Sequence, residues 1–572
     1  MPANVYQYGS QLKTVLTGEA EKQIRLQARF WNDLVEIEHE FSQRYRDVMN
    51  NADEKISSLN KEVGRRREEI EALRGEIKER RKKARSGRVD DSEIKKKIAE
   101  LLAENKHLIQ ELKDYRAEVK IMVKPRLHEL ESERRARVKE LRQQYATEGL
   151  YWGNYNAVLT SYQTARSRSM QSGGELRFRR FDGTGRLTCQ IQGGMSVEEA
   201  FSGANNLFQI DPVPETAWNI PSRGESRKLC RTKAKIRITS DEEKNPVWIE
   251  IPIVMHRPIP QNARIQRVSI STKKVADRIR WFLNVTVIED EPEKDDFAIG
   301  QVVALDVGWR KKEDGSIRVA YWIDSNGDTG EVELDVSFIH TDQRIRTLQK
   351  KRDDNFNVAK EKLSKWVSAR KEHEGVPEWF TERTDTLAQW RAQSRLAALI
   401  LFWRDNRFTG DGEVFSFLES WRRQDRHLWI WQANLRDKMS GRRLQQYRVF
   451  AAKAAKQYDA VIFEEFDLRS IKKKKRPEQG VDSDSSLRNF MKIAGVSILR
   501  SEVRRAFEAT GKLFVKEQTS GQGACPFCAE TAEREPGVGM FVSCTGCGKV
   551  YDRDWAKAKD LLSRWFVATK KL

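Results

Sequence analysis

Two Cys-x2-Cys pairs near the end of the sequence constrain the fold of this chain more than any other feature. Cys525 and Cys528 form the first pair, Cys544 and Cys547 form the second, and fifteen residues separate the pairs. This spacing is typical of a zinc ribbon, in which four thiolates hold one Zn2+ ion. A closed four-thiolate site is structural, so the pattern predicts a metal-stabilised module and no hydrolysis there. The alternative is four free cysteines that have this spacing by accident.

The two remaining cysteines, Cys189 and Cys230, lie in strand-like runs, where we expect them to be buried small hydrophobic residues. Six cysteines in 572 residues do not make a disulfide framework. The longest apolar run, Leu396–Trp403, is far shorter than the roughly 20 residues that span a bilayer. The first residues also lack the apolar core of a signal peptide. We therefore expect a cytoplasmic, nucleoid-associated protein.

The sequence is strongly basic, with 105 Lys and Arg residues against 85 Asp and Glu residues and a formal net charge of +20. Such an excess favours a polyanionic partner, because cationic side chains release the counterions of a nucleic acid on binding. The alternative is a basic soluble protein without such a partner. Charge alone thus favours nucleic-acid binding and leaves the fold open.

Residues 18 to 168 have a helical, highly charged pattern. Apolar residues form two narrow heptad-like seams on either side of an interruption at 83–93, so the pattern predicts an antiparallel helical hairpin. The seams comprise Ile56, Leu59, Val63, Ile70, Leu73 and Ile77, and then Ile94, Ile98, Leu101, Leu108 and Leu112. Pro125 is expected to kink or end the second arm. Such a hairpin suits either dimerisation or gripping a nucleic-acid duplex.

The periodicity changes at Gly173–Gly174 from a helical to an alternating pattern. Segment 175–191 alternates around the turn Asp-Gly-Thr-Gly and predicts a hairpin. Further strand-like segments lie at 233–238, 248–255 and 280–288. We therefore expect an antiparallel β-barrel or sandwich over 174–291, and we favour the barrel. Several outward positions are basic, which suggests a surface that meets phosphates.

Three acidic residues stand in positions that call for a partner. Asp306 lies inside an apolar strand-like segment, Glu464 ends a second one, and Asp554 stands at the start of a helix. A buried carboxylate costs several kcal/mol unless it is paired or bound to a cation. Three strands, helices and then another strand is the order of an RNase H-like fold, whose first and fourth strands are neighbours. That arrangement would place Asp306 beside Glu464.

Three converging carboxylates raise one another's pKa values unless divalent cations neutralise them. Two Mg2+ ions held by Asp306, Glu464 and Asp554 would stabilise the attacking and leaving oxygens of a phosphodiester displacement. For any one of these acids, an ion pair or an edge position is the alternative. The seven histidines form no compact nuclease motif, so we expect a single hydrolytic site. The ribbon would then steady the short segment that presents Asp554.

Four segments, in this order, resemble the split RuvC domain and zinc ribbon of type V CRISPR effectors and their TnpB relatives: "ALDVG", "FEEFDL", "QTSGQGACPFC…CTGC" and "DRDWAKAKDLL". The stretches "GLYWGNYNAVL" and "ELRFRRFDGTGRL", with the compact length, are most similar to the small subtype V-M effectors. The resemblance covers 300–572 by motif and the N-terminal half by domain order. It implies a multidomain α+β fold with a helical recognition insert, an antiparallel β-barrel wedge domain and an RNase H-like (RuvC) α/β domain with a zinc ribbon.

The implied domains follow one another along the whole chain. They are a wedge strand at 1–17, a helical recognition domain at 18–173, a wedge β-barrel at 174–291, a linker at 292–299, the first two RuvC motifs with a helical insert at 300–519, a zinc ribbon of the target-strand loading type at 520–550, and the third RuvC motif with the C-terminal helix at 551–572.

The resemblance implies an RNA-guided protein of antiviral defence, bacterial or phage, that binds guide RNA (crRNA) and double-stranded target DNA as a monomeric ribonucleoprotein. By position, Asp306, Glu464 and Asp554 match the family's catalytic, Mg2+-binding acids, and the four clustered cysteines match its zinc ligands. A basic run would lie near the nucleic-acid channel or, alternatively, form a solvated loop. It comprises Lys472, Lys473, Lys474, Lys475 and Arg476.

The third motif departs from the family pattern Asp-x-Asn-Ala-Ala-x-Asn. After Asp554 the sequence reads Trp-Ala-Lys-Ala-Lys-Asp, so both asparagines are missing and Lys557 and Lys559 lie near the predicted acidic site. An ammonium group there either competes with a second metal ion or points to solvent. Subtype V-M effectors are understood to silence DNA by binding it and to use RuvC to mature guide RNA, and this behaviour is our expectation. The alternatives are an active RNA-guided DNA endonuclease using the same acids, and a plain DNA-binding regulator.

Overall fold

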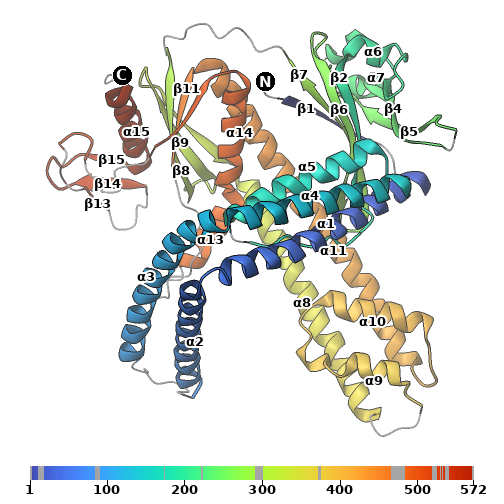
Figure 1. Cartoon of the computed structure of the whole chain (residues 1–572). Coiled ribbons are helices and arrows are strands. Elements are labelled where there is room, and N and C mark those ends of the chain that lie inside the picture. Colours follow the sequence, from blue (N-terminus) through green and yellow to red (C-terminus); the bar gives the residue numbers. More distant parts are fainter. Residues whose placement is uncertain are drawn as a thin grey trace. The chain divides into compact units, whose positions relative to one another are not determined.

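The structure is a computed structural model that describes residues 3–10, 18–83, 91–172, 174–220, 223–241, 243–289, 300–370, 375–465, 483–517, 525–528, 530, 532–534 and 540–569. The chain divides into two compact units, whose elements are labelled in Figure 1. The sheet unit comprises Met1–Asn4, Lys273–Arg280 and Ile288–Leu572, and the helical unit comprises Val5–Thr272 and Trp281–Val287. Among the described helices, none combines the length and the apolar character needed to cross a membrane.

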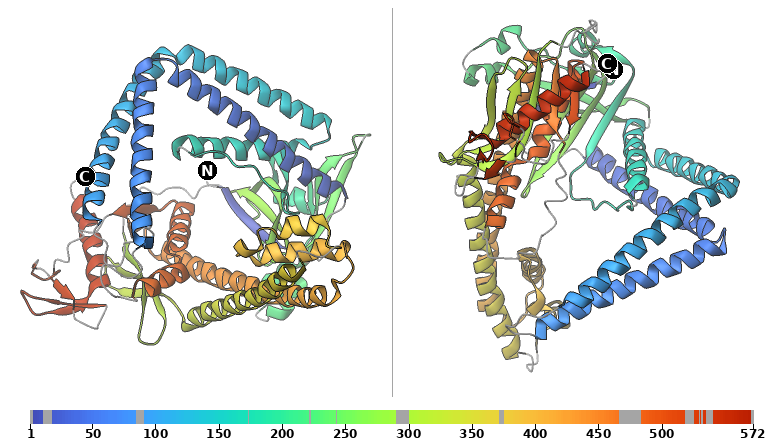
Figure 2. Two further views of the ribbon diagram at one scale, coloured as in Figure 1. Left: turned by 90° about the horizontal axis from the view of Figure 1, so that it is seen from below. Right: turned by 90° about the vertical axis from the view of Figure 1, so that its left-hand side faces the viewer.

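The predicted short strand is β1 (Ala3–Gly9), which belongs to the helical unit from Val5 onward, and the unit continues into a series of long helices. These are α1 (Gly18–Asn50), α2 (Glu54–Lys83), α3 (Ser92–Met122), α4 (Lys124–Thr147) and α5 (Trp152–Ser172). Helices α2 and α3 form the predicted hairpin and run side by side in both views of Figure 2. Ile56, Leu59 and Leu112 are buried in their shared core. Pro125 stands in the first turn of α4, so the second arm ends where the sequence predicted.

A second core in this unit was not predicted, and it joins α1 to α4 and α5. Phe30 and Leu34 of α1 are fully buried there together with Tyr145 and Tyr162. The two tyrosine hydroxyls donate hydrogen bonds to carboxylates of α1, at 2.6 Å in each case. The hairpin therefore extends from a packed helical base.

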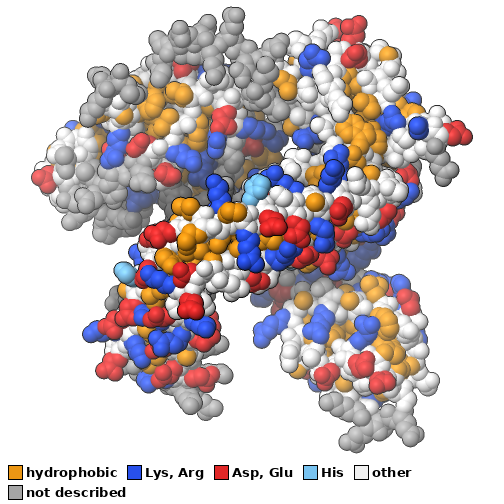
Figure 3. Space-filling model, in the orientation of Figure 1, with side chains coloured by type: hydrophobic (Ala, Val, Ile, Leu, Met, Phe, Trp, Pro, Cys, Tyr) orange, Lys and Arg blue, Asp and Glu red, His pale blue; other side chains and the backbone are white. Residues whose placement is uncertain are grey.

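The surface of the helices carries charges of both signs, and Figure 3 shows basic and acidic side chains interspersed there. Many of these charges pair within the chain. Arg44 of α1 lies 2.7 Å from Glu133 of α4, and Lys97 of α3 lies 3.3 Å from Glu69 of α2. Exposed pairs of this kind contribute little stability. They do reduce the positive charge that these helices present to a partner.

The hairpin predicted at 175–191 is wrong in its first arm, because the strand β2 begins only at Arg186. The preceding segment lies along α1 instead of pairing with another strand. Trp31 donates its indole N–H to the carbonyl of Arg177 at 3.1 Å, and Asn32 exchanges hydrogen bonds with the backbone of Arg179 at 2.7 and 3.0 Å. Side chains of α1 thus satisfy the backbone groups that a partner strand would have satisfied.

The β-rich part of the helical unit consists of two open sheets. It comprises β2 (Arg186–Ser196), α6 (Val197–Phe201), β3 (Phe208–Ile210), the 3-10 turn η1 (Glu215–Trp218), α7 (Arg223–Leu229), β4 (Arg231–Ser240), β5 (Pro246–Val254), β6 (Arg264–Val275) and β7 (Arg278–Ile288). The strand orders are β1-β7-β6-β2 and β3-β4-β5. Cys189 and Cys230 are buried, as predicted.

The predicted β-barrel is wrong, since neither of these sheets closes within the described residues. A closed barrel needs a hydrogen-bonded ladder at every seam. Here the two sheets contact each other through β2 and β4, and only an isolated bridge between Ser10 and Ile253 joins their edges. The alternating pattern correctly predicted antiparallel strands. Such a pattern does not indicate whether the two edge strands of a sheet pair and close it into a barrel.

The sheet unit is built on one five-stranded sheet with the order β10-β9-β8-β11-β12. Its strands are β8 (Val302–Lys311), β9 (Ile317–Asp324), β10 (Thr329–Leu334), β11 (Ala460–Glu464) and β12 (Leu513–Glu517). Strand β11 pairs in parallel with β8, from Ala460 beside Val302 to Phe463 beside Leu305. The first and fourth strands are therefore neighbours, as the order of elements predicted.

Helices cover both faces of this sheet. The helices of the sheet unit that pack on it are α8 (Val336–Arg370), α11 (Gly412–Gln457), α13 (Ser483–Ala494), α14 (Val496–Ala509) and α15 (Arg553–Thr569). Three shorter elements, α9 (Glu378–Thr384), the 3-10 turn η2 (Leu387–Gln389) and α10 (Gln393–Asp405), form a separate core with α8 and α11. Val303 and Leu305 of β8 pack against α11 and α14, whereas Val302 and Ala304 pack against α15. Successive residues of a strand face opposite sides, so the face toward α15 is the one that carries Asp306.

Candidate metal centres

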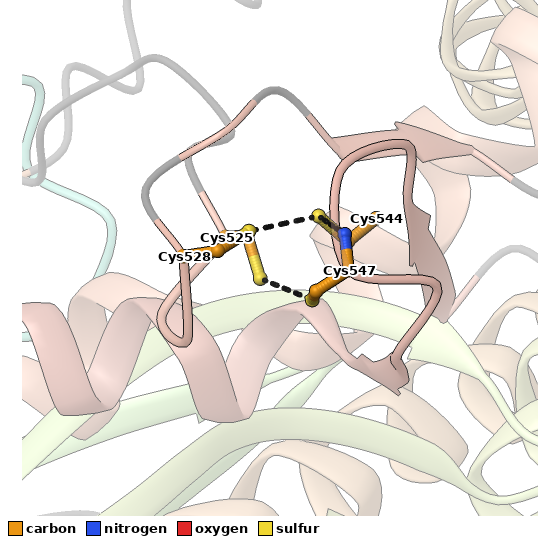
Figure 4. A group of neighbouring side chains, drawn as sticks. All are labelled: Cys525, Cys528, Cys544 and Cys547. Atoms are coloured by element: carbon orange, nitrogen blue, oxygen red, sulfur yellow. Dashed lines mark hydrogen bonds between the residues drawn. The ribbon is translucent and has the colours of Figure 1, made fainter.

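Four cysteines form a cluster beside the small sheet of β13 (Ala532–Arg534), β14 (Phe541–Cys544) and β15 (Val550–Asp552). Figure 4 shows the thiols pointing toward one another. The sulfur atoms of Cys525 and Cys547 lie 3.6 Å apart, and those of Cys528 and Cys544 lie 3.3 Å apart. All four sulfurs lie within 4.8 Å of one another. The two sequence pairs therefore fold into one group, as their spacing predicted.

Backbone N–H groups point at two of these sulfurs. Phe527 donates to Cys525 Sγ and Cys547 donates to Cys544 Sγ, each at 3.4 Å. Burial raises the pKa of Cys525, but the N–H groups of Phe527 and Cys528 and the neighbouring thiols lower it to about 6. Donors that stabilise thiolates, together with four sulfurs within 4.8 Å of one another, suit a zinc ion.

The cysteine cluster is continuous with the start of α15. Tyr551 and Trp555 pack against Cys525 and Cys544, and the ring of Phe527 stacks on Trp555 with centroids 5.8 Å apart. Strand β15 runs directly into α15, so the ribbon fixes the first turn of this helix. Asp554 lies in that turn.

The three predicted acids lie on the face of the large sheet that α15 covers. The parallel register ends with Phe463 beside Leu305, so Asp306 and Glu464 are the next residues on neighbouring strands. Helix α15 packs on the same face through Ala558 and Leu561, which lie four residues after Asp554 and Lys557, respectively. Asp306, Glu464 and Asp554 are only 2%, 4% and 4% exposed. Folding thus buries all three near one another.

The carboxylates of Asp306 and Glu464 are in direct electrostatic contact. Burial and then the charge of Glu464 raise the pKa of Asp306 well above its usual range, and Asp554 adds to this effect while Lys557 opposes it. The backbone N–H of Val307 donates to Glu464 Oε2 at 3.3 Å. A buried pair of acids is costly unless positive charge compensates it.

That positive charge comes from three side chains of the protein itself. Lys557 Nζ lies 3.4 Å from Asp306 Oδ1 and 3.1 Å from Glu464 Oε1. Asp554 pairs with two arginines of the large sheet. These are Arg310 of β8, at 3.1 Å, and Arg318 of β9, at 3.5 Å.

Arg318 is almost fully buried and forms ion pairs with several acids at once. Its guanidinium lies 2.6 Å from Asp552 and also pairs with Glu331. Opposing effects act on its pKa, because burial lowers it while Asp552 and Glu331 raise it. The net pKa is raised, so Arg318 is a permanent cation beside Asp554.

The carboxylates do not fit the divalent cations that the sequence predicted as well as the cysteines fit zinc. Of the described residues, only the four cysteines form a group of three or more potential ligands that could hold a metal ion. Each of the acids Asp306, Glu464 and Asp554 is instead engaged by Lys or Arg. A two-cation site would require those contacts to be broken.

Comparison with known proteins shows which family this chain belongs to. A protein of Thermanaerosceptrum fracticalcis, described as "CRISPR-associated DNA-binding protein Cas12m", is 38% identical over 443 residues, which are 77% of this chain and 73% of the relative. A protein of Allomeiothermus silvanus with the same description is 35% identical over 443 residues, covering 77% and 80%. The chain belongs to the Cas12m family. A Cas12m protein of Pelobacter propionicus, 26% identical over 570 residues, covers 95% of this chain and 84% of its own length.

No protein-family profile matches the chain. Among solved structures, a Cas12f1–sgRNA–target DNA complex covers 72% of this chain and 70% of its own with 9% identity and a TM-score of 0.34. The mini-RNA-guided endonuclease CRISPR-Cas_phi3 covers 68% and 63% with 14% identity and a TM-score of 0.30. Scores this low carry no structural argument, so the assignment to the Cas12m family rests on sequence identity.

A basic cavity of about 510 Å³ lies in the helical unit of this Cas12m chain. Residues of α1 and α5 line it together with Arg179, Arg180 and Arg186. Burial lowers the pKa of Arg186, and the neighbouring Arg267 lowers it further. Asp182 is the acidic residue of the same lining, against the three arginines. This cavity is suited to an anionic group.

Sequence reasoning identified Lys557 as a departure from the family pattern but missed Arg310 and Arg318. The available signal for Arg310 was its even spacing from Asp306 along the same strand. A register irregularity between Val307 and Arg310 weakens that signal. The predicted nucleic-acid contacts Lys472–Lys475 and Arg476, and the linker at 292–299, lie outside the described residues.

Proposed function

We propose that this chain is a guide-RNA-dependent DNA-binding protein that silences its target by occupying it. The observation that carries this proposal is the identity of 38% and 35% to two proteins described as CRISPR-associated DNA-binding proteins. Guide pairing would read the target sequence, and the protein would recognise the heteroduplex by shape and charge. The net charge of +20 supports such a partner.

We assign the proposed domains along the lines that the motifs imply. The helices of 18–173 would be the recognition domain, and the two open sheets would be the wedge domain. The five-stranded sheet with its helices would be an RNase H-like RuvC domain, with the cysteine module as its zinc ribbon. Asp306, Glu464 and Asp554 would then be the RuvC acids, and the four cysteines would hold structural zinc.

For nucleic-acid contacts we propose the cavity lined by Arg180 and Arg186 and the basic run Lys472–Lys475 with Arg476. Guanidinium groups pair with phosphate oxygens through charge-assisted hydrogen bonds. The measurement is the dissociation constant for guide RNA and for target DNA as a function of salt. Replacing Arg186 with Ala should weaken binding and reduce the slope of log K against log salt by about one.

For the RuvC acids we propose cleavage of precursor guide RNA that depends on a divalent cation. The test uses purified protein, a cognate guide, Mg2+, labelled target DNA and labelled precursor RNA in parallel. We expect guide-dependent DNA binding without DNA cleavage, and cleavage of the RNA. Guide-independent specific DNA binding would instead support a plain DNA-binding regulator.

Matched variants distinguish a role of these acids in RNA cleavage from a role in the structure or in DNA binding. Asp306→Asn, Glu464→Gln and Asp554→Asn should each abolish RNA cleavage and leave guide-dependent DNA binding intact. Asp560→Asn lies on the same helix as Asp554 but pairs with Arg564 at 3.0 Å, so it should leave both activities unchanged. Unchanged RNA processing in Asp306→Asn would overturn the assignment of these acids.

The second candidate function is an active RNA-guided DNA endonuclease that uses the same acids. The Lys and Arg contacts around the three carboxylates would have to open before Mg2+ could act there, for RNA as for DNA, so they favour the binding function over either cleavage. Cleavage of target DNA in the same assay would establish the second candidate. Size-exclusion chromatography with light scattering would test the expected monomeric ribonucleoprotein.

A further inference from the structure

Lys557 holds an unusual place among the charged side chains of α15. Its side chain is 33% exposed, whereas those of its two partners, Asp306 and Glu464, are 2% and 5% exposed. The aliphatic stem therefore reaches from the helix surface to a buried acidic pair and places the ammonium group against both carboxylates.

The position of this ammonium is set by the fold on both sides. The next residue, Ala558, and then Leu561 pack against Val302 and Ala304 of β8, which fixes α15 over the sheet. The parallel pairing of β8 and β11 fixes the spacing of the two carboxylates. The ammonium therefore lies between two immobilised acids, 3.1 and 3.4 Å from their oxygens.

The ammonium group of Lys557 contacts both acids. The nearby Lys559 differs, because its ammonium lies over the rings of Phe527 and Trp555, at 5.6 and 4.9 Å from their centroids. Of the two lysines in the altered motif, Lys557 is the one that contacts the acids.

We propose that Lys557 is a built-in cation that takes the place of a divalent ion between Asp306 and Glu464 and thereby sets a low affinity of this site for divalent metals. One positive charge at this position repels an incoming divalent ion and occupies the oxygens that would bind it. Arg310 and Arg318 likewise place positive charge beside Asp554. Unlike Lys557, both arginines belong to strands of the large sheet. The inference deepens the proposed function. It rests on that function in one respect, which is that Asp306, Glu464 and Asp554 are the ligands of the divalent metal.

The test measures Mn2+ binding to the full-length, zinc-loaded protein by electron paramagnetic resonance of free Mn2+. Lys557→Met keeps the length of the side chain and removes its charge, and Lys557→Gln is a second neutral variant in case the first does not fold. Either variant should bind Mn2+ at least about tenfold more tightly than the unaltered chain, since a nearby unit charge is removed. Adding Asp306→Asn to the neutral variant should abolish the gain.

Lys559→Met is the matched control, because it removes a lysine two residues away that does not contact the acids. Lys557→Arg keeps the charge, and both of these variants should bind Mn2+ as the unaltered chain does. Equal Mn2+ affinity of folded Lys557→Met, folded Lys557→Gln and the unaltered chain would overturn the proposal. So would a gain of the same size in Lys559→Met.

This experiment is separate from the test of RNA processing, since it needs no substrate and no turnover. Unchanged RNA cleavage in Asp306→Asn would reject the processing function, while a Mn2+ gain in Lys557→Met would still support the role of Lys557. Conversely, loss of RNA cleavage in Asp306→Asn with no Mn2+ gain would support the site and reject the built-in cation.

Discussion

The C-terminal segment contributes to two clusters of potential metal ligands, and the two clusters differ in what compensates their charge. The four thiols of the ribbon lie within 4.8 Å of one another. The three carboxylates under α15 are engaged by Lys557, Arg310 and Arg318. One cluster is arranged for an ion from solution, and the other is already neutralised by the chain.

A set of metal-type ligands is therefore not yet a metal site. Sequence spacing shows which ligands can converge, but side chains from other segments decide whether positive charge is still needed there. A cluster that lacks cations of its own depends on an added ion for its stability, whereas a cluster that contains them is stable without one.

The largest effect should come from breaking the thiol cluster. Cys544→Ser removes one of the four zinc ligands. Removing a residue that only hydrogen-bonds a ligand lowers metal affinity by about 10- to 100-fold, so losing a ligand itself should lower zinc affinity by more than about a hundredfold. The purified variant should contain far less than one zinc per chain, measured by inductively coupled plasma mass spectrometry. Cys230→Ala changes a buried cysteine outside the cluster and should retain the zinc. Full zinc content in Cys544→Ser would contradict the role of the cluster.

A smaller but still large effect should follow from removing the most buried cation of the carboxylate cluster. Arg318→Met leaves Asp552, Asp554 and Glu331 without their shared partner. Removing one member of a buried ionic network costs about 3–5 kcal/mol. Native-state hydrogen exchange of β9 and α15 should report this as a lower free energy of local opening. Unchanged exchange would mean that the remaining groups compensate.

Lys557→Met should have an intermediate effect that depends on metal. In buffer without added divalent ions, the unpaired acids Asp306 and Glu464 should lower the local stability of α15 by about 1–3 kcal/mol. Added Mn2+ should restore protection in this variant and change it little in the unaltered chain. Hydrogen exchange at several Mn2+ concentrations measures both effects, and a loss that Mn2+ does not reverse would count against a shared binding position.

The smallest effect should come from an exposed pair on the same helix. Arg564 lies 3.0 Å from Asp560, and their side chains are 41% and 34% exposed. Arg564→Ala should change the free energy of opening of α15 by no more than about 0.5 kcal/mol, because solvent screens such pairs. A change as large as that in Arg318→Met would remove the distinction between buried and exposed cations.

Local patterns in the sequence correctly predicted the thiol cluster, the neighbouring strands β8 and β11, and the ends of the second hairpin arm. The Cys-x2-Cys spacing predicted the thiol cluster, and the order of strands and helices predicted that β11 lies beside β8. The break before Ser92 and the position of Pro125 predicted both ends of the second hairpin arm. These features follow from hydrophobic spacing and backbone restrictions within short segments.

The features that sequence analysis missed depend on contacts between distant segments. The barrel prediction failed because alternation does not reveal whether edge strands pair, and among the described residues they meet only at Ser10 and Ile253. The first arm of the predicted hairpin failed because Trp31 and Asn32 satisfy its backbone. Arg318 reaches Asp554 across 236 positions of the chain, and no local pattern encodes such a pairing.

The long separation between Lys557 and its partners also has a consequence for synthesis on the ribosome. Lys557 is 251 positions from Asp306 and 93 positions from Glu464. Strands β8 and β11 therefore emerge from the ribosome long before the lysine that compensates their acids has been made. The nascent chain must carry an uncompensated acidic pair until α15 has been made, so this helix completes the site late in synthesis.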